Sequence, residues 1–119
     1  MRFHHIGLET ANLEKAISFY TERFGYTVEK QFHFMNEEIV FLVLGNTRLE
    51  LISNQEENNT AHLCYEVNTL EDVMKQLDPK KLIEGPYFLE NGWKSVFYEG
   101  PNQEMIEFLQ IRTEIQTIF

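Results

Sequence analysis

The spacing of apolar residues changes several times along the chain and divides it into short strands and two helices. Residues 2–9 alternate without a helical period and predict a strand, and the aligned residues 61–67 predict another. Apolar residues then recur every three or four positions, which predicts helices within residues 10–26 and over 69–77. Runs of β-branched and aromatic residues predict further strands, near residues 26–35, 38–44, 47–53, 82–89, 93–99 and 104–111.

Short local signals mark the ends of both helices. Asn12 or Thr10 can cap the first helix by accepting a hydrogen bond from its first turn, and Gly25 ends it. Asp78 and Pro79 end the second helix, because the residue before a proline disfavours the helical conformation. The predicted order is therefore a strand, a helix and three strands, found twice.

The two halves of the chain repeat each other in sequence. Residues 5–17 (HIGLETANLEKAI) align without a gap with residues 62–74 (HLCYEVNTLEDVM), so that His5 falls on His62 at an offset of 57 residues. A βαβββ unit of this size is too small to bury both faces of its own sheet, so the two units must pack together. We therefore expect an α+β fold in which two tandem βαβββ modules form a curved mixed sheet around a cleft, with the helices on its outer face.

The length of 119 residues predicts one compact domain with a single core, residues 1–119. Within it we distinguish module one (1–53), a polar and acidic linker (54–60), module two (61–111) and a C-terminal tail (112–119).

The chain is acidic, with a formal net charge of −9 at pH 7. Nucleic acid and anionic membrane surfaces require a basic patch, so neither is expected as the main partner. The N-terminus has no apolar signal-peptide core and the apolar runs are short, which leaves the cytoplasm as the expected location. The single cysteine, Cys64, excludes an internal disulfide and a thiolate metal cluster and is expected to be a small buried side chain.

The repeat also equates two glutamates. Glu50 and Glu107 are separated by the same 57 residues as the two histidines, and each lies in the last strand of its module. Because neighbouring strand residues point to opposite faces, the apolar neighbours of each glutamate would meet the helices, and the glutamates would share the concave face with His5 and His62. Each residue alone could be structural: a glutamate on the solvent side of a strand, or a strand histidine. Together, two imidazoles and two carboxylates suit an octahedral divalent ion that keeps two positions for water or substrate.

The motifs resemble those of the vicinal oxygen chelate superfamily, which includes glyoxalase I, methylmalonyl-CoA epimerase, the extradiol dioxygenases and the fosfomycin and bleomycin resistance proteins. The segments HHIGLETANLEKAISFYTERFGY, LELI, AHLCYEV and GPNQEMIEFLQ carry the resemblance, which covers residues 3–111. Neither His4, which should point to the opposite face, nor His33 matches a ligand position. The resemblance implies one divalent ion per site (Zn, Ni, Co, Mn or Fe) with four ligands: His5, Glu50, His62 and Glu107.

Within this superfamily, position 50 discriminates best between reactions. Epimerases often carry glutamine there, whereas glyoxalase I carries glutamate, so the ligand set resembles that of a glyoxalase I-like (lactoylglutathione lyase-type) lyase or a related isomerase. Such an enzyme moves a proton next to a carbonyl through a metal-stabilised enediolate, and its base would be a metal-site glutamate, Glu107 or Glu50. The alternatives are a methylmalonyl-CoA epimerase-like enzyme and a non-catalytic small-molecule (antibiotic) binding protein.

One residue departs from the glyoxalase pattern. Many bacterial glyoxalases place an arginine four residues after the first ligand, where it holds an anionic end of glutathione, and this chain has Glu9. The reversed charge argues against glutathione as the thiol carrier. Lys94, Arg48 and Arg23 are the cations that could compensate for it, although each can equally be an ordinary surface charge.

The expected partner is a small carbonyl or thioester substrate. Trp93, Phe97 and Tyr98 could line its pocket, unless they are core residues. Open βαβββ sheets leave edges that members of the superfamily cover by pairing two chains, so the resemblance also implies a homodimer.

Overall fold

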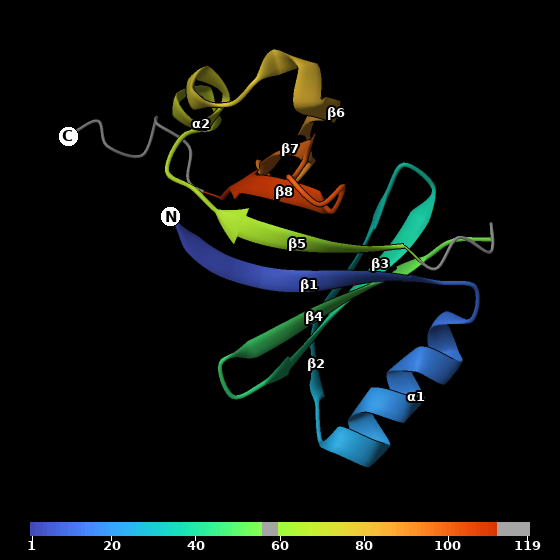
Figure 1. The fold of residues 1–119 in the computed structure, drawn as a ribbon. Helices are drawn as coiled ribbons and strands as arrows, with labels where there is room; N and C mark the ends of the chain where they lie inside the picture. The colour runs from blue at the N-terminus through green and yellow to red at the C-terminus, as the bar shows by residue number, and fades with distance from the viewer. Residues whose placement is uncertain (56–59, 112–119) are drawn as a thin grey trace. The chain divides into compact units, whose positions relative to one another are not determined.

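The computed structural model describes residues 1–55 and 60–111 of the chain. In this part of the chain, two βαβββ modules follow one another (Figure 1), which confirms the predicted α+β class. The predicted tail and most of the predicted linker lie outside the described residues. The elements are, in order, β1 (Arg2–Thr10), α1 (Leu13–Phe24), β2 (Thr27–Phe34), β3 (Glu37–Leu44), β4 (Thr47–Ser53), β5 (Ala61–Glu66), α2 (Leu70–Gln76), the 3₁₀-helix η1 (Pro79–Lys81), β6 (Leu82–Phe88), β7 (Lys94–Glu99) and β8 (Met105–Gln110).

The sequence repeat is visible in the positions of the helices. Leu13 begins α1 and Leu70 begins α2, at the 57-residue offset of the repeat. α1 continues for 12 residues, whereas α2 ends after 7, because Leu77 and Asp78 are extended ahead of Pro79. The 3₁₀-helix η1 follows, and the apolar pattern did not predict it.

The ends of α1 follow the local signals in the sequence. The side chain of Asn12 accepts a hydrogen bond from the backbone N–H of Lys15 at 3.0 Å. Thr10 Oγ1 accepts a hydrogen bond from the backbone N–H of Asn12 at 3.1 Å. At the other end, Gly25 has a φ of +84°, a left-handed conformation that favours glycine. Asn12 is therefore the cap residue, and Thr10 supports it.

The described residues form two compact units. The N-terminal unit lies within His5–His62, and the C-terminal unit combines Met1–His4 with the described residues from Leu63 onward, so that β1 and β5 contribute residues to both. The hydrogen-bonded strand order is β2-β3-β4-β1 in the N-terminal unit and β5-β8-β7-β6 in the C-terminal unit. None of the described helices is long and apolar enough to cross a membrane.

In the N-terminal unit, α1 packs against one face of the sheet. β3 is antiparallel to both β2 and β4, whereas β1 runs parallel to β4. Residues between the core positions, such as Phe41 and Glu50, face the other side of the sheet. That other side carries the candidate site. The core on the helix side is formed by alternate strand residues: Val40, Leu42, Leu49 and Leu51.

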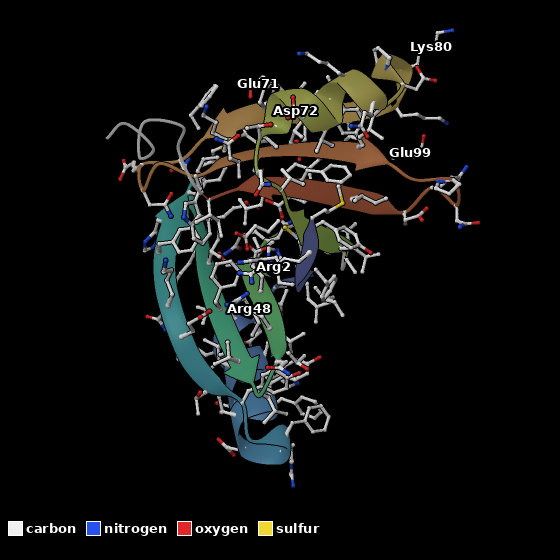
Figure 2. All side chains as sticks on the ribbon, turned by 90° about the vertical axis from the view of Figure 1, so that its left-hand side faces the viewer. Arg2, Arg48, Glu71, Asp72, Lys80 and Glu99 are labelled. Atoms are coloured by element: carbon white, nitrogen blue, oxygen red, sulfur yellow. The ribbon has the colours of Figure 1, made fainter. Side chains whose placement is uncertain are left out.

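In the C-terminal unit, α2 covers a second core. Tyr98, which the sequence offered as either a pocket or a core residue, is 4% exposed and belongs to this core. Glu71 and Asp72 lie in the first turn of α2 (Figure 2), where negative charge is favourable because the helix dipole is positive at this end. The buried core residues of this unit are Val67, Leu70, Val96, Tyr98 and Phe108.

The start of α2 depends on a buried side chain from β8. Gln110 is 1% exposed, and its Oε1 accepts a hydrogen bond from the backbone N–H of Leu70 at 2.9 Å, whereas the N-cap residue Thr69 makes no side-chain capping bond. We expect Gln110→Ala to lower the free energy of unfolding by about 1–3 kcal/mol, because it leaves a buried N–H without this acceptor. Urea unfolding measures the change. The matched variant Gln76→Ala, on the exposed side of α2, should change stability by less than about 0.5 kcal/mol. Equal effects of the two substitutions would contradict the capping role.

Candidate metal centre

Strand pairing brings Glu50 of β4 next to β1 on the side of the N-terminal sheet that α1 leaves uncovered. In the parallel β1–β4 pair Gly7 lies opposite Glu50, and in the antiparallel β3–β4 pair Phe41 lies opposite it. His5 is two residues before Gly7 and therefore points to the same face of the sheet. Strand alternation thus places a histidine and a carboxylate on one face of adjacent strands.

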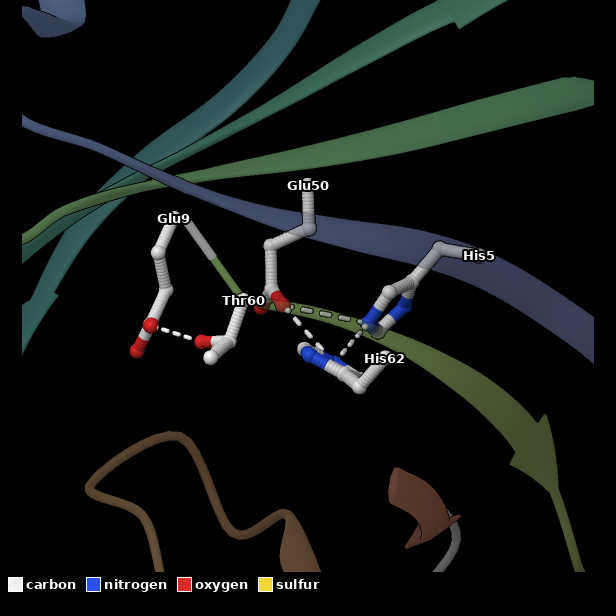
Figure 3. A network of polar contacts seen from close by, with 5 residues as sticks. All are labelled: His5, Glu9, Glu50, Thr60 and His62. Atoms are coloured by element: carbon white, nitrogen blue, oxygen red, sulfur yellow. Dashed lines mark hydrogen bonds and ion pairs between the residues drawn. The ribbon is translucent and has the colours of Figure 1, made fainter. Parts of the chain in front are cut away.

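Three of the four predicted ligands meet in this unit (Figure 3): His5, Glu50 and His62, here called the His–Glu triangle. Nε2 of His5 lies 3.2 Å from Oε1 of Glu50, and Nε2 of His62 lies 3.3 Å from the same oxygen. The two Nε2 atoms are 3.3 Å apart. The three residues are only 1%, 6% and 7% exposed. Two imidazole nitrogens and one carboxylate oxygen therefore converge in a buried place.

The hydrogen-bonding pattern of the His–Glu triangle depends on which ring nitrogens carry protons. The carboxylate of Glu50 only accepts, and if both Nε2 atoms donate to it, their N–H groups oppose each other across 3.3 Å. If only one ring nitrogen carries a proton, the lone pair of the other lies against the carboxylate oxygen at 3.2 or 3.3 Å. A cation between the three atoms removes both conflicts, because each atom then acts as an electron-pair donor.

The spacing of the three atoms fits a shared divalent ion. Nitrogen and oxygen ligands bind Zn²⁺ at about 2.0–2.2 Å, so two ligand atoms of one ion lie roughly 2.8–3.6 Å apart for bond angles between octahedral and tetrahedral. The observed separations are 3.2, 3.3 and 3.3 Å. Imidazole and carboxylate are also the donors preferred by the divalent metals that the resemblance implies. The residues present therefore fit such an ion.

The fourth predicted ligand, Glu107, belongs to the C-terminal unit. It lies in β8 opposite Phe97 of β7 and is 7% exposed. Its neighbour Phe108 is part of the core beneath α2, so Glu107 faces the other side of that sheet, as strand alternation requires. A buried carboxylate needs a cation or hydrogen-bond donors nearby. Its place in the repeat matches that of Glu50, and its binding to the same ion stays a prediction.

The remaining histidines and the cysteine are not members of the His–Glu triangle. His33 is exposed on β2, and Cys64 is fully buried. His4 is buried in the C-terminal unit, where its ring centroid lies 6.1 Å from that of Trp93 at an interplanar angle of 85°. These positions agree with the expected surface histidine and small buried thiol.

A second polar contact lies on the same face of β1 as His5. The hydroxyl of Thr60 donates a hydrogen bond to the carboxylate of Glu9 (Figure 3). The backbone N–H of Glu9 also donates to the carbonyl of Thr60 at 3.0 Å. Glu9 is in phase with His5 along the strand, so it adds negative charge to this face. The sequence pointed to Glu9 but not to Thr60, whose partner is 51 residues away in the chain.

Two of the three cations that could balance Glu9 have other neighbours. Arg48 binds Glu29 through two contacts, Nε to Oε1 at 2.9 Å and Nη2 to Oε2 at 3.2 Å. The ammonium group of Lys94 lies 5.9 Å from the ring centroid of Phe88, within cation–π range. The charge of Arg48 is therefore directed at Glu29. The negative charge of Glu9 would still repel an anionic group of a substrate.

The fold is shared with solved structures of low sequence identity. A hypothetical protein from Bacillus halodurans superposes with a TM-score of 0.77 at 16% identity, over 95% of this chain and 96% of that one. Methylmalonyl-CoA epimerase from Mycobacterium tuberculosis superposes with a TM-score of 0.75 at 14% identity, over 98% of this chain and 92% of that one. At these identities the likeness establishes the fold and nothing more specific.

A family comparison then identifies the class. Residues 4–97 match the model of the Glyoxalase/Bleomycin resistance protein/Dioxygenase superfamily, so the chain belongs to this superfamily, as its motifs indicated. Among curated proteins, the mitochondrial methylmalonyl-CoA epimerases of Mus musculus and Homo sapiens are 30% and 29% identical over an alignment of 96 residues, and the matches cover 68% of this chain. The chain spans 54% of the length of these two relatives.

Proposed function

We propose that this chain is a metal-dependent isomerase or lyase that moves a proton at a carbon next to a carbonyl. The observation that carries the proposal is the His–Glu triangle, whose three buried donor atoms lie 3.2–3.3 Å apart in a superfamily that includes an epimerase. A divalent cation would stabilise this buried donor set, because it would offset the free-energy cost of removing a carboxylate and two ring nitrogens from water.

Each residue of the proposed centre has a distinct role. His5, His62 and Glu50 would hold the ion, and Glu107 would be its fourth ligand. A bound divalent ion supplies Lewis-acid stabilisation of the negative charge that develops on the carbonyl oxygen. Glu107 or Glu50 takes the proton from the carbon next to the carbonyl and returns it in the product. The low exposure of these side chains keeps water from competing for the proton.

Two substrate classes are consistent with this reaction, and each is favoured by one observation. The curated relatives are methylmalonyl-CoA epimerases, which favours an acyl-CoA thioester. The carboxylate at position 50 resembles the ligand set of glyoxalase I, which favours an α-oxoaldehyde hemithioacetal. Glu9 speaks against glutathione as the thiol in the second class, because its charge would repel an anionic carrier on this face.

Metal analysis and deuterium exchange test the proposal together. Protein purified without chelator should contain close to one divalent ion per chain. In D₂O, proton NMR should show solvent deuterium entering the carbon next to the carbonyl of one substrate class. The panel comprises methylmalonyl-CoA and the methylglyoxal hemithioacetals of glutathione and of an uncharged thiol. Exchange should stop after treatment with a chelator and return when Zn²⁺, Ni²⁺ or Co²⁺ is added.

The alternative outcomes are distinct. A chain with no bound metal that retains a small molecule would favour the binding protein and contradict the proposal. Firm metal binding without exchange in any substrate would refute these two substrate classes and leave only metal binding in place. The homodimer and the cytoplasmic location expected from the sequence stay predictions.

A further inference from the structure

Gly7 lies so close to the ring of His62, a proposed metal ligand, that a side chain at position 7 would collide with it. A Cβ atom added to Gly7 would lie 2.0 Å from Cε1, 2.5 Å from Nδ1 and 2.6 Å from Nε2 of His62. Several other glycines of the chain have a positive φ, but Gly7 is not among them. Its glycine is therefore required for space and not for backbone conformation.

The imidazole of His62 has little room to move away from such a Cβ. It is 7% exposed and packs edge-on against the ring of His5, with centroids 5.3 Å apart at 80°. Its Nε2 also contacts Glu50 at 3.3 Å. Ordinary van der Waals contact with a Cβ begins at 3.4 Å, so Cε1 would have to shift by about 1.4 Å.

A shift of that size exceeds what metal coordination tolerates. Ligand distances in metal sites are held to about ±0.2 Å, and the Zn–N bond itself is only about 2.0–2.1 Å long. Gly7 is also the residue opposite Glu50 in the β1–β4 pair, so the space that it leaves open adjoins the carboxylate of the triangle.

We propose that Gly7 is a positioning residue for metal binding. Because it has no side chain, it leaves the space in which the His62 imidazole lies beside His5 and Glu50. The inference rests on the proposed function only in naming a metal as the ligand. It predicts that the smallest substitution, Gly7→Ala, acts on the metal through His62 and not through the fold in general.

The packing can be tested first in the unmodified, metal-free protein. Proton NMR should show a strong nuclear Overhauser effect between an Hα of Gly7 and Hε1 of His62. This measurement needs neither activity nor metal, so it separates failure of the inference from failure of the proposed function. Absence of the effect in assigned spectra would overturn the inference.

Metal titration then tests the consequence. Gly7→Ala should weaken the affinity for Zn²⁺ or Ni²⁺ by about 100-fold, the upper end of what misplacing a ligand through its supporting residue costs. The control Ile6→Val alters the adjacent residue, which packs towards α1, and should leave the affinity within about twofold, as expected for a site that does not touch it. Retained affinity in Gly7→Ala would overturn the inference.

A double-mutant cycle distinguishes positioning from general damage. In a His62→Ala background no imidazole occupies the space beside Gly7. Adding Gly7→Ala should therefore change the remaining metal affinity by less than about twofold. The same cycle measured by urea unfolding of the metal-free protein should show that Gly7→Ala destabilises the His62→Ala protein less than it destabilises the unmodified one. Equal effects in both backgrounds would show that Gly7 acts independently of His62, and would refute the proposal even if Gly7→Ala folds poorly.

Discussion

Replacing His62 by alanine is expected to abolish tight binding of a divalent ion, and His5→Ala is expected to do the same. Each imidazole supplies one of three donor atoms that lie 3.2–3.3 Å apart in the His–Glu triangle. Losing a ligand should weaken the affinity by more than the roughly 100-fold that losing a supporting residue costs. Titration calorimetry with Ni²⁺, or competition with a chelator of known affinity, measures the loss. Exchange activity should fall with the metal content.

A histidine outside the centre provides the control for this prediction. His33 is exposed on β2 and should tolerate alanine with no change in metal affinity. Urea unfolding of all three variants checks that the fold persists. If the His62→Ala protein still binds the ion as tightly as the unmodified chain, the triangle is a structural cluster and the proposed chemistry is wrong.

The second large effect is expected from Glu107→Gln. If Glu107 is the base, the amide cannot accept the proton, and kcat should fall by about 10²- to 10⁴-fold, the range that general base catalysis contributes. An amide oxygen still binds a metal, so the metal content should stay near that of the unmodified protein. Deuterium exchange into the substrate and metal analysis of the same sample measure the two effects separately.

Glu50→Gln should behave differently, because Glu50 is the common partner of both imidazoles and carries the charge of the triangle. It should weaken metal affinity more than Glu107→Gln does. Glu71→Gln, which removes one charge from the exposed start of α2, is the control for net charge and should change neither quantity. The reverse pattern, with kcat lost in Glu50→Gln at full metal content, would assign the base to Glu50.

The features that the sequence predicted correctly depend on short-range periodicity. Alternation within a strand decides which face Glu50 occupies, because Leu49 and Leu51 must reach the core beneath α1. The repeat then relates His5 to His62 without any knowledge of the fold. The strand period of two and the repeat offset of 57 residues were therefore enough to predict that His5, Glu50 and His62 share one site, and the structure brings these three side chains together.

The features that the sequence did not reveal depend on contacts between distant residues. Thr60 acquires its role only because β5 starts beside Glu9. In the sequence Gly7 is an ordinary glycine within a strand, and only the structure shows that the ring of His62 lies against it. The cap of α2 likewise comes from Gln110, 40 residues further along the chain, and no local signal marks that partner.

The parallel pairing of β1 with β4 has a consequence for folding. Gly7 and Glu50 become neighbours only when residues far apart in sequence adopt one register, and a slip of a single residue would turn the carboxylate towards α1. An unfolded or misregistered chain thus offers no chelating pocket. Any ion that binds here selects the correctly paired chain and lowers its free energy in proportion to the logarithm of the metal concentration. The availability of the ion in its surroundings would then govern how long the folded chain survives.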